Sequence, residues 1–182
     1  MDSGKISADN TDGYGFMTNL ALQSNTWQPS AGPSLVLGAG GAARAVLVAL
    51  LDAGAPKIYL CNRTQARAEN LATDISDRVE VIDWQNKVNV LPEVVTVVNS
   101  TSLGMTGKPA LQFDLTNVNP NALVTDLIYA PLETQLLKDA RARGCEVVSG
   151  IGMLLHQGVP GFEAWFGSRP VVDEELEALV LT

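Results

Sequence analysis

The chain has 182 residues, of which 46% are apolar, enough to form the core of one domain of ordinary size. Its net charge of −8 argues against nucleic acid and anionic membrane surfaces as partners. No apolar run approaches the roughly 20 residues that cross a bilayer, no signal-peptide pattern opens the sequence, and two cysteines make no disulfide framework, so we expect a cytoplasmic protein.

The first predicted helix follows a polar segment. Asn10-Thr11-Asp12 precedes apolar residues at Phe16, Met17 and Leu20, whose spacing predicts an amphipathic helix. On spacing alone, Asp12 fits the N-cap carboxylate of this helix better than a catalytic group. Residues 27–33, which contain two prolines and a glycine, predict a linker.

A short apolar strand at residues 35–37 runs directly into the glycine-rich segment Gly38-Ala39-Gly40-Gly41-Ala42-Ala43. This segment fits the dinucleotide fingerprint G-x-G-x-x-A: Gly38 makes the tight turn, Gly40 lets a pyrophosphate approach the backbone, and Ala43 lets the next helix pack closely. We expect that helix to begin at about Gly41, so that its unpaired N–H groups point at the phosphates.

The second strand, at residues 57–61, ends in Asn62-Arg63-Thr64. A site for NAD carries an acidic residue here, whereas this chain has Arg63, with Arg67 one helical turn further on. A guanidinium suits a 2′-phosphate. Arg63 alone fits a solvated loop residue better, but together with the glycine-rich segment the pattern favours NADP as the cofactor.

The remaining elements alternate between helices and strands. We expect a helix at 63–75, with Ala66, Leu71 and Ile75 as inward positions, and another at 132–143, with Leu132 on its apolar face and Gly144 just beyond its end. Pro160 predicts a kink or a shifted start in a helix at 153–166, and residues 173–181 predict a closing amphipathic helix. Strands are expected at 79–84 (near a sheet edge), 94–98, 122–128 and 146–149.

This alternation predicts an α/β fold of the Rossmann type: a doubly wound, parallel, six-stranded sheet of order 3-2-1-4-5-6 with helices on both faces. We interpret residues 1–182 as one domain, with an entry loop, helix and linker at 1–33, a nucleotide-binding core at 34–167 and a C-terminal helix at 168–182. Ligand is expected across the carboxyl ends of the strands, at residues 38–43, 62–64, 99–104, 127–129 and 150–153.

At this point the chain resembles the shikimate dehydrogenases. The resemblance rests on motifs in the same order over residues 10–167: Asn10-Thr-Asp-Gly-x-Gly-Phe16, Gly38-Ala-Gly-Gly-Ala-Ala-Arg44, Asn62-Arg-Thr64, Asn99-x-Thr-x-x-Gly-Met105, Asp126-x-x-Tyr-x-Pro131, Gly150-x-x-Met-Leu-x-x-Gln157 and Phe162-x-x-Trp-x-Gly167. It implies reversible hydride transfer between NADPH and 3-dehydroshikimate, giving shikimate, as a step of aromatic amino-acid and chorismate biosynthesis.

The resemblance also implies roles for individual residues. Asp12 matches the aspartate of the proton-transfer pair and, with Tyr129 and Gln157, a position that touches the substrate. The cofactor-binding positions fall into three groups. The pyrophosphate group is Gly38, Ala39, Gly40, Gly41 and Ala42; the 2′-phosphate and ribose group is Asn62, Arg63, Thr64 and Arg67; the nicotinamide group is Thr101, Leu127, Gly150 and Met153.

The chain departs from the family pattern at its start. In this family the lysine partner of the aspartate lies in an N-terminal substrate domain that precedes the Asn-Thr-Asp-Gly motif, and Lys5 does not match it. We therefore expect this chain to be the cofactor-binding part of the enzyme, able to bind NADP(H) but weakly active or inactive. A quinate/shikimate-type paralogue and a non-catalytic NADP-binding module stay open. Oligomeric state is not predicted, and His156, the single histidine, has no neighbours at metal-ligand spacing.

Overall fold

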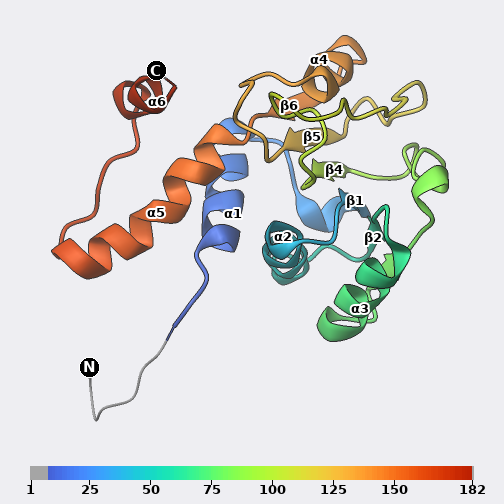
Figure 1. Ribbon diagram of the computed structural model, residues 1–182, viewed down its shortest axis with the longest axis horizontal. Helices are drawn as coiled ribbons and strands as arrows, with labels where there is room; N and C mark the ends of the chain where they lie inside the picture. The colour runs from blue at the N-terminus through green and yellow to red at the C-terminus, as the bar shows by residue number, and fades with distance from the viewer. Residues whose placement is uncertain (1–7, 182) are drawn as a thin grey trace.

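The computed structural model describes residues 8–181, and Lys5 lies outside them. Six strands form one sheet in the order β3-β2-β1-β4-β5-β6, in which every neighbouring pair is parallel (Figure 1). The strands are β1 (Ser34–Leu37), β2 (Ile58–Cys61), β3 (Val79–Val81), β4 (Thr96–Asn99), β5 (Leu123–Asp126) and β6 (Glu146–Val148). The predicted fold class and strand order are confirmed, including the edge position of β3.

One face of the sheet is covered by four helices, α1 (Asp12–Gln23), α2 (Gly41–Asp52), α3 (Gln65–Ile75) and α5 (Ile151–Phe166). Their buried side chains pack on alternate strand residues, of which Val36 and Val98 lie at the centre of the sheet. Alternate residues of a strand point to opposite faces, so Leu35 and Leu37 pack on the other side, beneath α4 (Gln135–Ala142) and the loops around Leu91 and Leu115.

The chain order creates a switch point beside β1. After β1 the chain passes through α2 to β2 on one side, and after β3 it returns to β4 on the other side of β1. In open α/β sheets the carboxyl ends of the strands flanking such a point form the ligand-binding edge. Here that edge carries the glycine-rich segment after Leu37 and the loop that follows Asn99.

Two local predictions were wrong. Leu132 lies outside α4 and is exposed, because the helix begins only at Gln135. In α3, Ala66 faces solvent and Ala68 is buried instead. Pro160 lies inside α5, which begins at Ile151, before the expected start at Met153, and runs on through the proline to Phe166.

The last helix, α6 (Glu174–Val180), follows an extended segment after α5. Its cap is Asp173, whose side chain accepts a hydrogen bond from the N–H of Leu176 at 2.9 Å. Among residues 8–181 no helix is long and apolar enough to span a membrane.

Candidate functional site

The turn after β1 is fixed by two neighbouring strands. Gly38 has a φ of +107°, a conformation that favours glycine, and a Cβ at this position would lie 2.7 Å from Ser100 Oγ. The Gly38 N–H donates to the Cys61 carbonyl at 2.8 Å, and Ser100 Oγ donates to the Leu37 carbonyl at 2.7 Å. The ends of β1, β2 and β4 are therefore joined at this turn.

The outer side of the same turn is open. A Cβ added to Gly40 or Gly41 would meet no atom within 4 Å, and Gly40 is the N-cap of α2 without any side-chain capping bond. Among residues 8–181, no side chain caps the first turn of α2, where the backbone at Gly40 and Gly41 is open. This is the shape and polarity that a pyrophosphate needs at a helix N-terminus, so the segment from Gly38 to Ala42 fits a dinucleotide.

The end of β2 presents two exposed arginines. Asn62 Nδ2 donates to the Thr64 carbonyl at 2.9 Å, which holds the turn into α3. In the part of the chain that the structure describes, neither Arg63 nor Arg67 has a carboxylate within 4.0 Å, so both cations lack an internal counter-charge. Arg67, but not Arg63, lines a cavity of about 300 Å³ together with the glycine-rich segment.

A buried hydrogen-bond network lies behind the loop that carries Thr101. The N–H and Oγ1 of Thr101 both donate to Asn99 Oδ1, at 3.1 and 2.7 Å. Asn99 Nδ2 donates to Asp126 Oδ1 at 3.0 Å, and Thr134 Oγ1 donates to Asp126 Oδ2 at 2.7 Å. Asn99, Asp126 and Thr134, which we call the strand-end network, join the ends of β4 and β5 to the start of α4.

Burial raises the pKa of the Asp126 carboxyl, although hydrogen bonds from Thr134, Ile128 and Asn99 act in the opposite direction. The sequence placed Asn99 in the expected ligand-binding segment 99–104 and Asp126 in a family motif, but it did not predict that the two side chains bond to each other. The available signal was that two buried strands each end in a polar residue, which a hydrogen-bond partner must satisfy.

Leu127, Gly150 and Met153 are brought together where β5 meets α5. A Cβ on Gly150 would lie 2.4 Å from the backbone carbon and oxygen of Leu127, so only glycine fits this position. Met153 is buried in the first turn of α5 and packs in the same core cluster as side chains of α1 and α2. These three residues and the Thr101 loop therefore lie next to one another at adjacent strand ends.

Asp12 and Gln157 lie on two helices in close contact, since α1 and α5 approach through Gly15. Asp12 is the first residue of α1, and the predicted N-cap role was wrong: the N-cap is Thr11, without a side-chain bond. The side chain of Asn10 holds Asp12 instead, accepting from its N–H at 2.9 Å and donating to Oδ2 at 3.3 Å. Tyr129 comes from a third element, the loop after β5, and is exposed.

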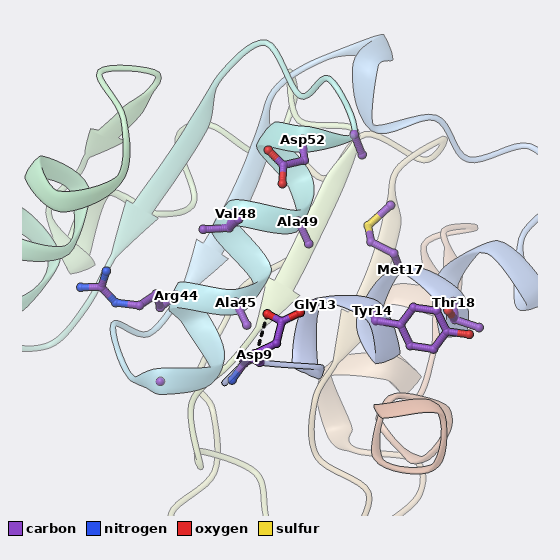
Figure 2. A pocket seen from close by; sticks show the side chains of 13 residues that line it. Asp9, Gly13, Tyr14, Met17, Thr18, Arg44, Ala45, Val48, Ala49 and Asp52 are labelled. Carbon is purple, nitrogen blue, oxygen red and sulfur yellow. Dashed lines mark hydrogen bonds between the residues drawn. The ribbon is translucent and has the colours of Figure 1, made fainter. Parts of the chain in front are cut away.

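A second cavity, of about 660 Å³, lies between α1 and α2 (Figure 2). Tyr14 and Met17 line it from α1, and Val48 and Ala49 line it from α2. Of the predicted site residues only Gly41 reaches it. This cavity is a space between two helices, whereas Arg67 and the open glycine-rich segment line the smaller cavity of about 300 Å³.

The sequence matches two families of known proteins. Residues 22–106 match the family described as Shikimate / quinate 5-dehydrogenase, and residues 150–179 match Shikimate 5'-dehydrogenase C-terminal domain. A curated shikimate dehydrogenase (NADP(+)) of Cereibacter sphaeroides strain KD131 is 58% identical over 98% of this chain. The chain spans about 64% of that relative's length.

Solved structures give the same assignment. The quinate dehydrogenase of Corynebacterium glutamicum, in complex with NAD, has a TM-score of 0.85 and 32% identity, covering 95% of this chain and 62% of that protein. The shikimate 5-dehydrogenase of Thermus thermophilus, in complex with NADP(H) and shikimate, has a TM-score of 0.74 and 34% identity, covering 89% and 58%. With its parallel sheet, its glycine-rich turn and these matches, the chain belongs to the shikimate dehydrogenase family.

Proposed function

We propose that this chain is the cofactor-binding part of an NADP-dependent shikimate dehydrogenase. The observation that carries the proposal is the pairing of an open glycine-rich turn at Gly40 and Gly41 with two arginines, Arg63 and Arg67, that have no carboxylate partner among the described residues. The curated relatives named shikimate dehydrogenase (NADP(+)) support the choice of substrate and cofactor.

The preference for NADP rests on charge. A 2′-phosphate carries about −1.5 to −2 charges at neutral pH and accepts several hydrogen bonds, which the planar guanidinium groups of Arg63 and Arg67 supply. NAD has only a hydroxyl at this position. The fold does not decide between the two cofactors, because the similar quinate dehydrogenase structure holds NAD.

When bound, NADPH supplies the hydride that reduces the ring ketone of 3-dehydroshikimate. The chain's own task is then to orient the reactants and to manage one proton. Asp12 stands partly exposed at the start of α1, where its carboxylate could hold a proton-donating lysine close to the substrate oxygen. Gln157 and Tyr129 are the proposed hydrogen-bond donors to the substrate's hydroxyl groups.

No lysine of residues 8–181 lies within ion-pair distance of Asp12. General acid catalysis contributes about 10²–10⁴-fold to such reactions. For these 182 residues alone we therefore expect NADP(H) binding with weak or no turnover of shikimate.

Calorimetric titration with NADP⁺ and NAD⁺, followed by a steady-state assay of shikimate oxidation, tests both parts of the proposal. We expect NADP⁺ to bind more tightly than NAD⁺ and the turnover to be low. Absence of NADP⁺ binding at millimolar concentration would overturn the cofactor assignment, and rates typical of a complete enzyme would overturn the expected low activity.

Quinate is the second candidate substrate, favoured by the likeness to the Corynebacterium glutamicum quinate dehydrogenase. Parallel assays of shikimate and quinate with each cofactor distinguish the two. Faster turnover of quinate than of shikimate would identify quinate as the preferred substrate.

A further inference from the structure

Arg44 occupies the first turn of α2, four residues after Gly40, and its backbone N–H donates to the Gly40 carbonyl at 3.1 Å. Arg44 is one of the residues that line the α1–α2 cavity (Figure 2), and its side chain reaches across to α3. There Arg44 Nη2 lies 2.6 Å from Asp74 Oδ2. The pair therefore bridges the helix that follows the glycine-rich segment and the helix that follows Arg63.

This ion pair forms part of the wall of the 300 Å³ cavity. The glycine-rich segment contributes Ala39, Gly40 and Gly41 to that cavity, and α3 contributes Arg67, Asn70 and Leu71. Arg44 and Arg67 thus face one small space from two helices. Around it the charges are two guanidinium groups and one carboxylate, that of Asp74.

Resting on the proposed NADP-binding function, we infer that Arg44 is a further determinant of 2′-phosphate recognition and that Asp74 is its internal competitor. In the free protein, Asp74 neutralises Arg44. When a nucleotide with a 2′-phosphate enters the cavity, the phosphate replaces the carboxylate as the partner of Arg44 and joins Arg67. A nucleotide with a bare 2′-hydroxyl leaves the Arg44–Asp74 pair as it is.

Two features make this exchange favourable: the Arg44–Asp74 pair is exposed to solvent, and Arg44 has N–H groups that the pair does not use. The side chains of Arg44 and Asp74 are 53% and 57% exposed, and ion pairs in such surroundings are weak because water and salt screen them. A phosphate with nearly two charges is a stronger partner than one carboxylate. In addition, only Nη2 of Arg44 has a side-chain partner among residues 8–181, so its other N–H groups remain available to a second oxygen.

The two partners predict opposite effects. Arg44→Ala should weaken binding of NADP⁺ about tenfold, as expected for the loss of one charge-assisted hydrogen bond, and leave binding of NAD⁺ unchanged. Asp74→Asn removes the competitor and its repulsion of the phosphate, so it should tighten binding of NADP⁺ about threefold. Arg44→Lys should fall between Arg44→Ala and wild type, because it keeps the charge but loses the planar fork.

The experiment is a set of calorimetric titrations with NADP⁺, NAD⁺ and 2′,5′-ADP, the last of which carries the 2′-phosphate without a pyrophosphate. The matched control is Arg141→Ala, since Arg141 forms a similar exposed ion pair with Glu133 at 3.1 Å in another part of the fold. Equal melting temperatures for the Arg44→Ala and Arg141→Ala proteins will show that both are folded.

Equal losses of affinity for NADP⁺ and NAD⁺ in Arg44→Ala would overturn the inference, because Arg44 would then contact the pyrophosphate that both cofactors share. Unchanged NADP⁺ binding in Arg44→Ala, or weaker binding in Asp74→Asn, would also overturn it, and would leave the proposed function intact provided that the wild-type protein binds NADP⁺. If the wild-type protein binds neither NADP⁺ nor 2′,5′-ADP, the proposed function fails and this inference fails with it.

Discussion

Gly15 of α1 and Gln157 of α5 are in such close contact that no side chain fits between them. A Cβ on Gly15 would lie 2.8 Å from Gln157 Cβ, 2.7 Å from Gln157 N and 2.6 Å from the Met153 carbonyl oxygen. Real Cβ atoms essentially never come this near to backbone atoms. The absence of a side chain at Gly15 therefore sets the distance between the two helices that carry Asp12 and Gln157.

We predict that Gly15→Ala destabilises the protein by about 1–3 kcal/mol, since the added methyl group forces the helices apart. Gly13→Ala is the matched control, because a Cβ there would make ordinary contacts at 3.5 Å and alanine favours a helix by about 0.5–1 kcal/mol. Urea unfolding of both variants measures the difference. Equal stability of the two variants would contradict the close-contact explanation.

Arg63→Ala is predicted to weaken binding of NADP⁺ by about 1.5–3 kcal/mol, the range for a charge-assisted hydrogen bond, and to leave NAD⁺ nearly unaffected. Calorimetry with each cofactor measures this. Arg143→Ala is the control, because Arg143 lies at the end of α4, where its side chain donates to Thr116. Equal losses for NADP⁺ and NAD⁺ would show that Arg63 does not contact the 2′-phosphate.

The strand-end network predicts a difference between two substitutions of Asp126. Asp126→Ala removes the acceptor of Asn99 Nδ2, the Ile128 N–H and the Thr134 hydroxyl. Three buried donors then lose their partner, so we expect a loss of about 3 kcal/mol or more. Asp126→Asn keeps one acceptor oxygen and the shape, and should cost about 1 kcal/mol. Chemical denaturation of both variants tests this, and similar losses would contradict it.

The raised pKa of Asp126 also predicts a pH dependence. Burial raises this pKa above the unfolded value of about 3.9, so the folded state binds the proton more tightly. The associated stability is fully present below about pH 3.9 and is lost as the pH rises through the raised folded pKa. Asp126→Asn has no such group. The stability of wild type relative to Asp126→Asn should therefore fall over this range, and a constant difference would refute the assignment.

His156 has a pKa lowered by burial and, to a smaller degree, by the positive charge of Arg169. Because the folded pKa lies below the unfolded value of about 6.5, the associated stability is present above pH 6.5 and is lost as the pH falls through the folded pKa. Arg169→Ala should raise this pKa and Arg169→Lys should not. As His156 is the single histidine, one NMR titration reports it directly. Identical midpoints in all three proteins would exclude an effect of Arg169.

The two cysteines are predicted to be unreactive in the folded protein. Burial raises the pKa of the Cys61 thiol to about 12, and burial also raises the pKa of Cys145. Since the thiolate is the reactive form, a disulfide reagent at pH 8 should modify neither cysteine until denaturant is added. The Cys145→Ser variant isolates Cys61. Rapid modification of that native variant would contradict the burial of Cys61.

The sheet was predictable from the sequence because its signals are local. Each central strand is a short, buried run, and the glycine-rich segment is contiguous with β1, so strand order and switch point followed from known chain topology. The site was predictable only in part. The role of Asp126 depends on Asn99, 27 positions earlier in the chain, and that of Asp74 depends on Arg44, 30 positions earlier.

The predicted start of α4 was wrong for the same reason: it depends on a contact with a residue distant in the sequence. Residues 132–134 were expected to be helical, but Thr134, the N-cap residue of α4, has an extended backbone and its hydroxyl donates to the buried Asp126. The spacing of apolar residues such as Leu132, Leu136 and Leu137 carries no information about that hydrogen bond. Likewise, the residues around Gly152 do not predict that this position needs glycine. The reason is a contact with another helix: a Cβ at Gly152 would lie 1.9 Å from Asn19 Oδ1.

The strand-end network also sets the direction of every hydrogen bond at Thr101. The backbone N–H of Thr101 can only donate, so the amide of Asn99 must turn its oxygen towards Thr101 and its NH₂ group inward to Asp126. The Thr101 hydroxyl gives its proton to that oxygen, and one of its lone pairs already receives the Leu103 N–H. The remaining lone pair can take a proton but has none to offer, so any molecule that rests against this threonine must arrive as the donor: a primary amide fits, whereas a carboxylate is repelled.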